Sequence, residues 1–175
     1  MVRMKTIVLC SGVAVTALLA QTGSKSSAIL HPEMKVAADA GTYAKPMGTL
    51  GEKPSQTWTQ TTIDAGVDKK PNAGHIRTVT GEIIDLSCYL QLGKHGEKHV
   101  SCGKKCLEAG QPIGLLASNG RIYMLMAEEH DPRRDGQTNF RADATGHLGH
   151  IMEVTGTEAS HAGFSAIYVQ GYVKK

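Results

Sequence analysis

Apolar residues alternate with polar ones, or gather in short runs, over five separate stretches in the last hundred residues of the chain. Such stretches are typical of β-strands in a small domain. Asn119-Gly120, between the second and third stretches, is a pair that a tight hairpin turn favours. The pattern therefore predicts a mainly β domain over residues 75–175. Its five expected strands cover residues 75–86, 113–117, 121–126, 149–158 and 164–173.

The same part of the chain predicts one or two short helices. Residues 97–109 follow the first strand, and Gly110 and Pro112 stand where a helix should end. Residues 139–145 are expected to form a second, shorter helix. The charged segment 128–136 is expected to be a surface loop.

Two of the expected strands contain a similar motif with a glycine inside it. Residues 75–81 and 150–156 match at five of seven positions, and each segment ends in glycine. Long strands that bend to serve two sheets are typical of a closed five-stranded barrel of the OB type. We therefore expect an OB-like barrel whose stronger helix follows the first strand.

The N-terminus has the layout of a secretory signal peptide. Arg3 and Lys5 precede an uncharged apolar run that ends at Ala20, and cleavage is expected there or as late as Ala28. The mature protein is thus expected to be periplasmic or secreted. Its contact with a membrane would then be limited to the transient signal peptide.

Residues 21–74 are rich in small, polar and proline residues, and no apolar face is evident. Such a segment predicts a flexible linker between the signal peptide and the domain. Trp58, the only tryptophan, lies within it and is a candidate for binding a partner in the cell envelope. Docking of Trp58 on the domain itself and simple exposure are the alternatives.

Composition argues against a nucleic-acid partner. The formal net charge is +3, and aromatic residues make up 5% of the chain. Nucleic-acid binding calls for a basic stripe with aromatic residues between the charges. The sequence shows neither feature.

Cysteine and histidine are concentrated in one segment of the predicted domain. On a helix over residues 97–109, His99, Cys102 and Cys106 would share one face. Cys88 follows the first strand, and the glycine loop that carries His95 can fold back toward that face. Thiolate and imidazole are ligands that zinc and copper accept. We therefore expect a zinc or copper site formed by Cys88, His99, Cys102 and Cys106, with His95 as an alternate ligand.

A disulfide is the competing interpretation of the same cysteines. Exported proteins meet an oxidising compartment in which neighbouring thiols pair. A bridge from Cys88 to Cys102 or Cys106 would close a loop of roughly fifteen residues and contribute about 3 kcal/mol in the chain-entropy model. It would leave one thiol free. Haem attachment is excluded because Leu107, and not histidine, follows Cys106.

Several of these segments together resemble a group of small exported bacterial proteins. The shared pattern is a strand that ends in Asp85-x-x-Cys88-Tyr89, then His-x-x-Cys-x-x-x-Cys, then Gly-x-Pro-Ile-Gly over residues 110–114. The similarity covers about residues 76–173, and it implies an OB-like barrel and an exported location. Function rests on the residues themselves. They favour a non-enzymatic metal-binding or thiol-redox module, or else a disulfide-stapled accessory subunit of an envelope complex.

Overall fold

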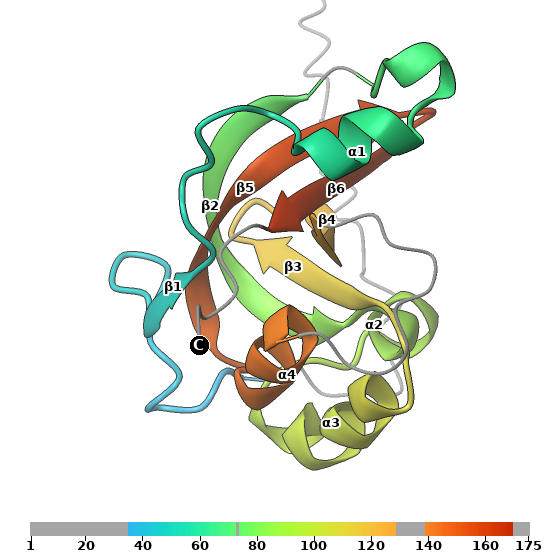
Figure 1. Ribbon diagram of the computed structural model, residues 1–175. Helices are drawn as coiled ribbons and strands as arrows, with labels where there is room; N and C mark the ends of the chain where they lie inside the picture. The colour runs from blue at the N-terminus through green and yellow to red at the C-terminus, as the bar shows by residue number, and fades with distance from the viewer. Residues whose placement is uncertain (1–34, 73, 129–138, 170–175) are drawn as a thin grey trace, which may run out of the picture.

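The computed structural model describes residues 35–72, 74–128 and 139–169. Five strands close into a barrel, and the prediction of a five-stranded, mainly β domain is confirmed (Figure 1). A sixth, short strand lies outside the barrel. The strands are β1 (Gly48–Leu50), β2 (His75–Asp85), β3 (Ile113–Ala117), β4 (Ile122–Ala127), β5 (Ile151–His161) and β6 (Phe164–Val169).

The order of the strands is that of an OB-like barrel. β2 pairs with β3 and β5, β3 pairs with β4, and β5 pairs with β6, all antiparallel. The parallel pair β4–β6 closes the ring. Helix α4 (Asn139–Gly146) lies between the third and fourth strands of the barrel, which is the usual place of the OB helix. The other helices are α1 (Gln60–Ala65), α2 (Leu86–Leu92) and α3 (Val100–Glu108), with 3₁₀ turns η1 (Val67–Lys69) and η2 (Glu97–His99).

Glycines allow the two longest strands to bend. β2 pairs with β5 along its first part and with β3 along its second part, and Gly81 belongs to both pairings. A Cβ at Gly81 would lie 2.7 Å from Leu115 Cγ, and one at Gly156 would collide with the carbonyl oxygen of Tyr168. Only glycine therefore lets the neighbouring strand approach at these bends.

The hydrophobic core fills the barrel and extends under two helices at one end. α2, α3 and α4 lie at that end, whereas α1 lies near the other (Figure 1). The interior residues come from all five barrel strands, from α3 and α4, and from the turn after α4, and they are almost fully buried. They include Ile83, Leu107, Leu115, Leu125, Phe140, Leu148, Val154 and Ile167.

Residues 35–72 differ from the flexible linker expected for residues 21–74, because they pack on the barrel. β1 pairs in parallel with the beginning of β5, and Met47 N donates to Ile151 O at 2.7 Å. Further along, the backbone N–H of Thr59 donates to Glu128 Oε1 at 2.8 Å. Leu50 joins the core of the barrel and Trp58 packs on Tyr168, whereas Met47 and Val67 are exposed, so no regular spacing of apolar residues in the sequence marks this segment.

Trp58 docks on its own domain. Its side chain is only 8% exposed, and its ring meets Tyr168 edge to face with centroids 5.2 Å apart. The indole Nε1 donates to Asn72 O at 2.9 Å. Little of the Trp58 side chain is therefore left exposed for the expected contact with a partner protein. The expected signal peptide, with residues 21–34, lies outside the described residues. No helix within the described residues is long and apolar enough to cross a membrane.

Candidate metal centre

Asp85 lies at the point where β2 ends and α2 begins. It is fully buried and is the N-cap of α2. Its Oδ1 accepts hydrogen bonds from the backbone N–H groups of Ser87, at 3.1 Å, and Cys88, at 3.4 Å. One carboxylate oxygen thus holds the first turn of the helix and fixes the position of Cys88, and the other oxygen is left to point elsewhere.

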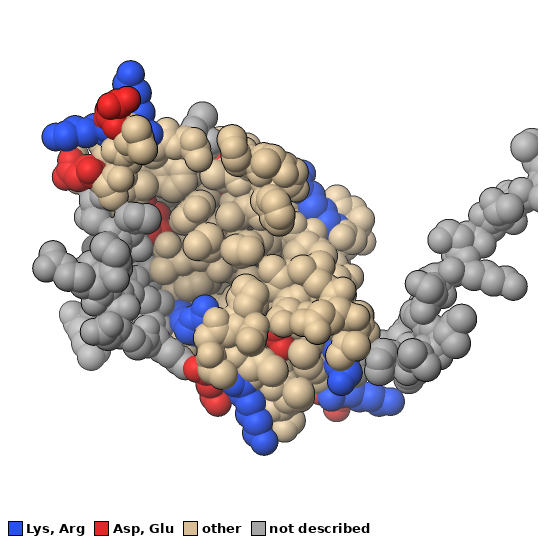
Figure 2. Space-filling view, turned by 90° about the vertical axis from the view of Figure 1, so that its right-hand side faces the viewer, with Lys and Arg blue, Asp and Glu red and all other residues tan. Residues whose placement is uncertain are grey.

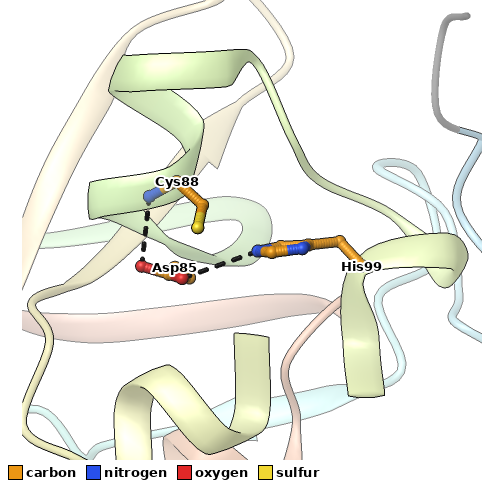
Figure 3. Close-up of side chains that lie close together, drawn as sticks. All are labelled: Asp85, Cys88 and His99. Carbon is orange, nitrogen blue, oxygen red and sulfur yellow. Dashed lines mark hydrogen bonds and ion pairs between the residues drawn. The ribbon is translucent and has the colours of Figure 1, made fainter. Parts of the chain in front are cut away.

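His99 reaches the same place from a different part of the chain. It ends the 3₁₀ turn η2 and is the N-cap of α3, and its side chain is 3% exposed. Its Nε2 lies 3.5 Å from Asp85 Oδ2 (Figure 3). A Cβ at Gly103 would lie 3.1 Å from that nitrogen, so the absence of a side chain there lets α3 pass over the imidazole.

Asp85, Cys88 and His99 form a group that can hold a metal ion. Each offers one ligand atom, and these atoms all lie within 4.8 Å of one another. Among the described residues, neither Asp85 Oδ2 nor His99 Nε2 has a hydrogen-bond partner, although both are buried. A buried polar atom without a partner costs about 1–3 kcal/mol. A cation bound between the two atoms would satisfy both of them.

The thiol of Cys88 is strongly held in its protonated form. Burial is the main cause that raises its pKa, to about 11, and the hydrogen bond and charge of Asp85 add to the effect. Burial also raises the pKa of Cys106, again with a contribution from Asp85, whereas a hydrogen bond from Cys88 acts in the opposite direction. Cys106 therefore lies beside the group. A bound cation would reverse this electrostatic balance and favour the thiolate.

The structure brings together only some of the expected ligands. Cys88 and His99 are brought together, Cys106 lies next to them, and Cys102 is exposed. The expectation that His99, Cys102 and Cys106 share one face assumed an α-helix that begins at residue 97. His99 instead belongs to a 3₁₀ turn and caps α3. His99 and Cys106 both reach Asp85, whereas Cys102, between them in the sequence, is exposed.

His95 has a different role from the one expected. Its Nδ1 lies 2.9 Å from Oε2 of Glu82, a carboxylate that is 1% exposed and also accepts from Gly96 N at 2.6 Å. The hydrogen bond to Glu82 raises the pKa of His95, although burial opposes the shift. Glu82 thus fixes the loop that leads into η2, and His95 helps to place His99.

Asp85 is a candidate ligand that the sequence did not predict. Asp85 belongs to the Asp-x-x-Cys-Tyr pattern noted above, but the expected ligand set contained only cysteine and histidine. A signal was nevertheless present, because an aspartate directly before a short apolar segment is a typical N-cap. Gly93, which ends α2 with φ 65°, gave the matching stop signal.

A separate apolar groove lies on the outside of the barrel, and Asp85, Cys88 and His99 are not among its lining residues. It has a volume of about 350 Å³ and is lined by α2, β4 and the β5–β6 hairpin. Exposed apolar side chains stand at its edge, among them Leu90 and Phe164, which are 67% and 76% exposed. Figure 2 shows the side of the molecule on which α2 lies, with uncharged side chains over its hollowed centre and most charged ones at the rim.

A comparison of the chain with protein families, with curated proteins and with solved structures finds no match. Functional inference therefore rests on the geometry of the site.

Proposed function

We propose that the protein is an exported, non-enzymatic module that binds one zinc or copper ion through Asp85, Cys88 and His99. The observation that carries the proposal is the pair Asp85 Oδ2 and His99 Nε2. Both atoms are buried, they face one another at 3.5 Å, and neither has a hydrogen-bond partner within the described segments. The thiol of Cys88 completes a set of three different donors.

The geometry of the pair suits a metal ion. Carboxylate oxygen and imidazole nitrogen bind zinc at about 2.0–2.2 Å, so two such atoms on one tetrahedral ion lie roughly 3.4 Å apart. The distance of 3.5 Å between Asp85 Oδ2 and His99 Nε2 agrees with this value. A direct hydrogen bond between the two atoms would normally be shorter.

Zinc is the first ion to test. It accepts thiolate, imidazole and carboxylate donors in one tetrahedral site, whereas copper in its reduced state prefers the softer sulfur ligand. The fourth position is open to a water molecule or to the neighbouring thiol of Cys106. Zinc bound to four protein ligands would be a structural site, and zinc with one exchangeable position would be a site for storage or transfer.

The test is elemental analysis of the purified protein, prepared without chelator and with any affinity tag removed. We expect about one zinc or copper ion per chain at this site, and loss of that ion in Cys88→Ser. Cys102→Ser is the matched control, because Cys102 is exposed and outside the group. A metal content that is the same in Cys88→Ser as in the wild type would overturn the proposal.

A second candidate function is favoured by the neighbouring thiols of Cys88 and Cys106. The thiol of Cys88 is close enough to that of Cys106 to act on its pKa, in the lowering direction. An oxidised pair would staple α2 to α3 and close a loop of about eighteen residues, which corresponds to about 3 kcal/mol in the chain-entropy model. The protein would then be a disulfide-stapled accessory subunit of an envelope complex.

The two candidates exclude one another at the same sulfur, because a disulfide removes the thiolate that a metal needs. Thiol titration of the unfolded protein after export separates them. The disulfide candidate predicts that Cys102 is the only reactive thiol beyond residue 28, whereas the metal candidate predicts that Cys88 and Cys106 react as well once the metal is removed. Three reactive thiols would therefore contradict the staple.

A further inference from the structure

Two further histidines face one another outside the site described above. His147 and His150 belong to a tight turn that follows α4, and their Nδ1 atoms lie 3.2 Å apart. The rings meet edge to face with centroids 5.4 Å apart. We propose that this His-Leu-Gly-His turn is a second metal site, in which both Nδ1 atoms chelate one divalent transition-metal ion. The site is independent of Asp85, Cys88 and His99.

The separation of the two nitrogens is the distance that a shared ion requires. Imidazole nitrogen binds zinc at about 2.0–2.1 Å, and two such nitrogens on one ion lie about 2.9 Å apart at a right angle and about 3.4 Å apart at the tetrahedral angle. The observed 3.2 Å between His147 and His150 falls between these limits. Copper, nickel and zinc all accept imidazole, and copper binds most tightly in the usual order of divalent ions.

The turn is held in place by the barrel. Gly149 N donates to Ile83 O at 2.8 Å, and Ile83 N donates to His150 O at 3.0 Å, so β2 binds the turn from both directions. Leu148, between the histidines, is 2% exposed and anchors the turn in the core. Gly149 has φ +83°, and a Cβ there would lie 2.7 Å from Val100 Cγ2. The two rings are therefore presented by a rigid backbone, which lowers the cost of ordering a ligand pair.

The surroundings of the pair leave it accessible to an ion. Both histidines are half-exposed, so water can complete the coordination. Asp39 is the acidic group that acts on His150, and it is kept close because Ile151 N donates to the carbonyl oxygen of Ala40, at 2.8 Å. Its negative charge favours a bound cation and opposes the effect of Lys104, the basic group that also faces His150.

Burial, rather than charge, is the main cause that lowers the pKa of His150. A neutral imidazole is the form that binds metals. A plain hydrogen bond from one Nδ1–H to the other Nδ1 is the alternative explanation of the short distance. That alternative predicts that the two histidines bind no metal ion.

The test uses Cu²⁺ as the probe, on tag-free protein carrying Cys88→Ser so that the thiolate site is silenced. We expect electron paramagnetic resonance to show nitrogen coupling from two imidazoles, and titration calorimetry to show one ion per chain. His150→Ala and His147→Ala should each weaken this binding by at least about tenfold, the loss that even an outer-shell partner of a metal produces. His161→Ala is the matched control, since His161 is an exposed histidine on β5.

Affinity and nitrogen coupling that stay the same in both histidine variants would overturn the inference. A circular dichroism melt of each variant without metal shows that the barrel is intact. Because Cys88→Ser is present throughout, the result does not depend on whether the Asp85 site binds metal.

Discussion

Replacing Asp85 by asparagine separates the two tasks of this side chain. Oδ1 caps α2, and Oδ2 faces His99 without a hydrogen-bond partner among the described residues. Asparagine is as good an N-cap as aspartate, so the cap remains. The second oxygen becomes an amide nitrogen, which cannot bind a metal. Asp85→Asn should therefore abolish metal binding and leave the fold intact.

The expected magnitudes follow from these contacts. Loss of the charge at the start of α2 costs about 0.3–1 kcal/mol, and the neutral amide is easier to bury than a carboxylate, so the two effects partly cancel. The free energy of unfolding without metal should change by less than about 1 kcal/mol. At a free zinc concentration a hundredfold above the dissociation constant, zinc should stabilise the wild type by about 2.7 kcal/mol and the variant by almost nothing.

Urea denaturation with and without zinc measures both quantities. Asp64→Asn on α1 is the matched control, because Asp64 is exposed and its Oδ1 accepts from Gln60, a contact that asparagine can keep. Asp85→Ala should additionally lose about 0.5–2 kcal/mol in the absence of metal, because it removes the cap. An equal stabilisation by zinc in the wild type and in Asp85→Asn would refute the assignment of Oδ2 as a ligand.

Three other predictions concern the surroundings of the site and the packed N-terminal segment. Gly103→Ala should disturb both Leu148 and the imidazole of His99, since its Cβ would lie 2.6 Å from Leu148 Cδ2 and 3.1 Å from His99 Nε2. Zinc affinity measured by chelator competition should therefore fall, and unchanged affinity would contradict this. His95 has a higher pKa in the folded protein than in the unfolded chain, where it is about 6.5. Its contribution to the free energy of unfolding should therefore be complete below about pH 6.5 and should be lost as the pH rises through the folded-state pKa. Urea denaturation across this pH range should show that the free energy of unfolding falls in the wild type and not in Glu82→Gln. The same pH dependence of the free energy of unfolding in both proteins would contradict the prediction. Trp58→Ala should cost about 3–5 kcal/mol by removing a buried aromatic ring, and a loss below about 1 kcal/mol in thermal or urea unfolding would show that the segment is not docked.

The barrel could be predicted from the sequence because its signals are local. The hairpin follows from Asn119-Gly120, where Gly120 has φ +80° and Asn119 Oδ1 accepts from the backbone N–H of Arg121. The bends follow from Gly81 and Gly156, whose neighbours leave no room for a Cβ. Each of these features depends on one or two residues and their immediate backbone.

The remaining features depend on contacts between distant parts of the chain. Nothing near Trp58 in the sequence announces that Tyr168 covers it. Helix α2 was missed because its seven residues are too short and too apolar to show a helical period. The metal group joins Asp85 and Cys88 to His99 only after η2 folds back over the end of β2, so the carboxylate could not be recognised from spacing alone.

The short parallel strand β1 also covers an edge of β5 that would otherwise be open to other molecules. β6 pairs only with the second half of β5, from Thr157 onward, so the first half of β5 has β2 on one side and β1 on the other. Without β1, the backbone of residues 152–154 would be an open edge next to the buried side chains of Met152 and Val154. Open apolar edges recruit strands from other molecules. A chain cut back to the five barrel strands would thus carry everything needed for closure and would still be prone to aggregate.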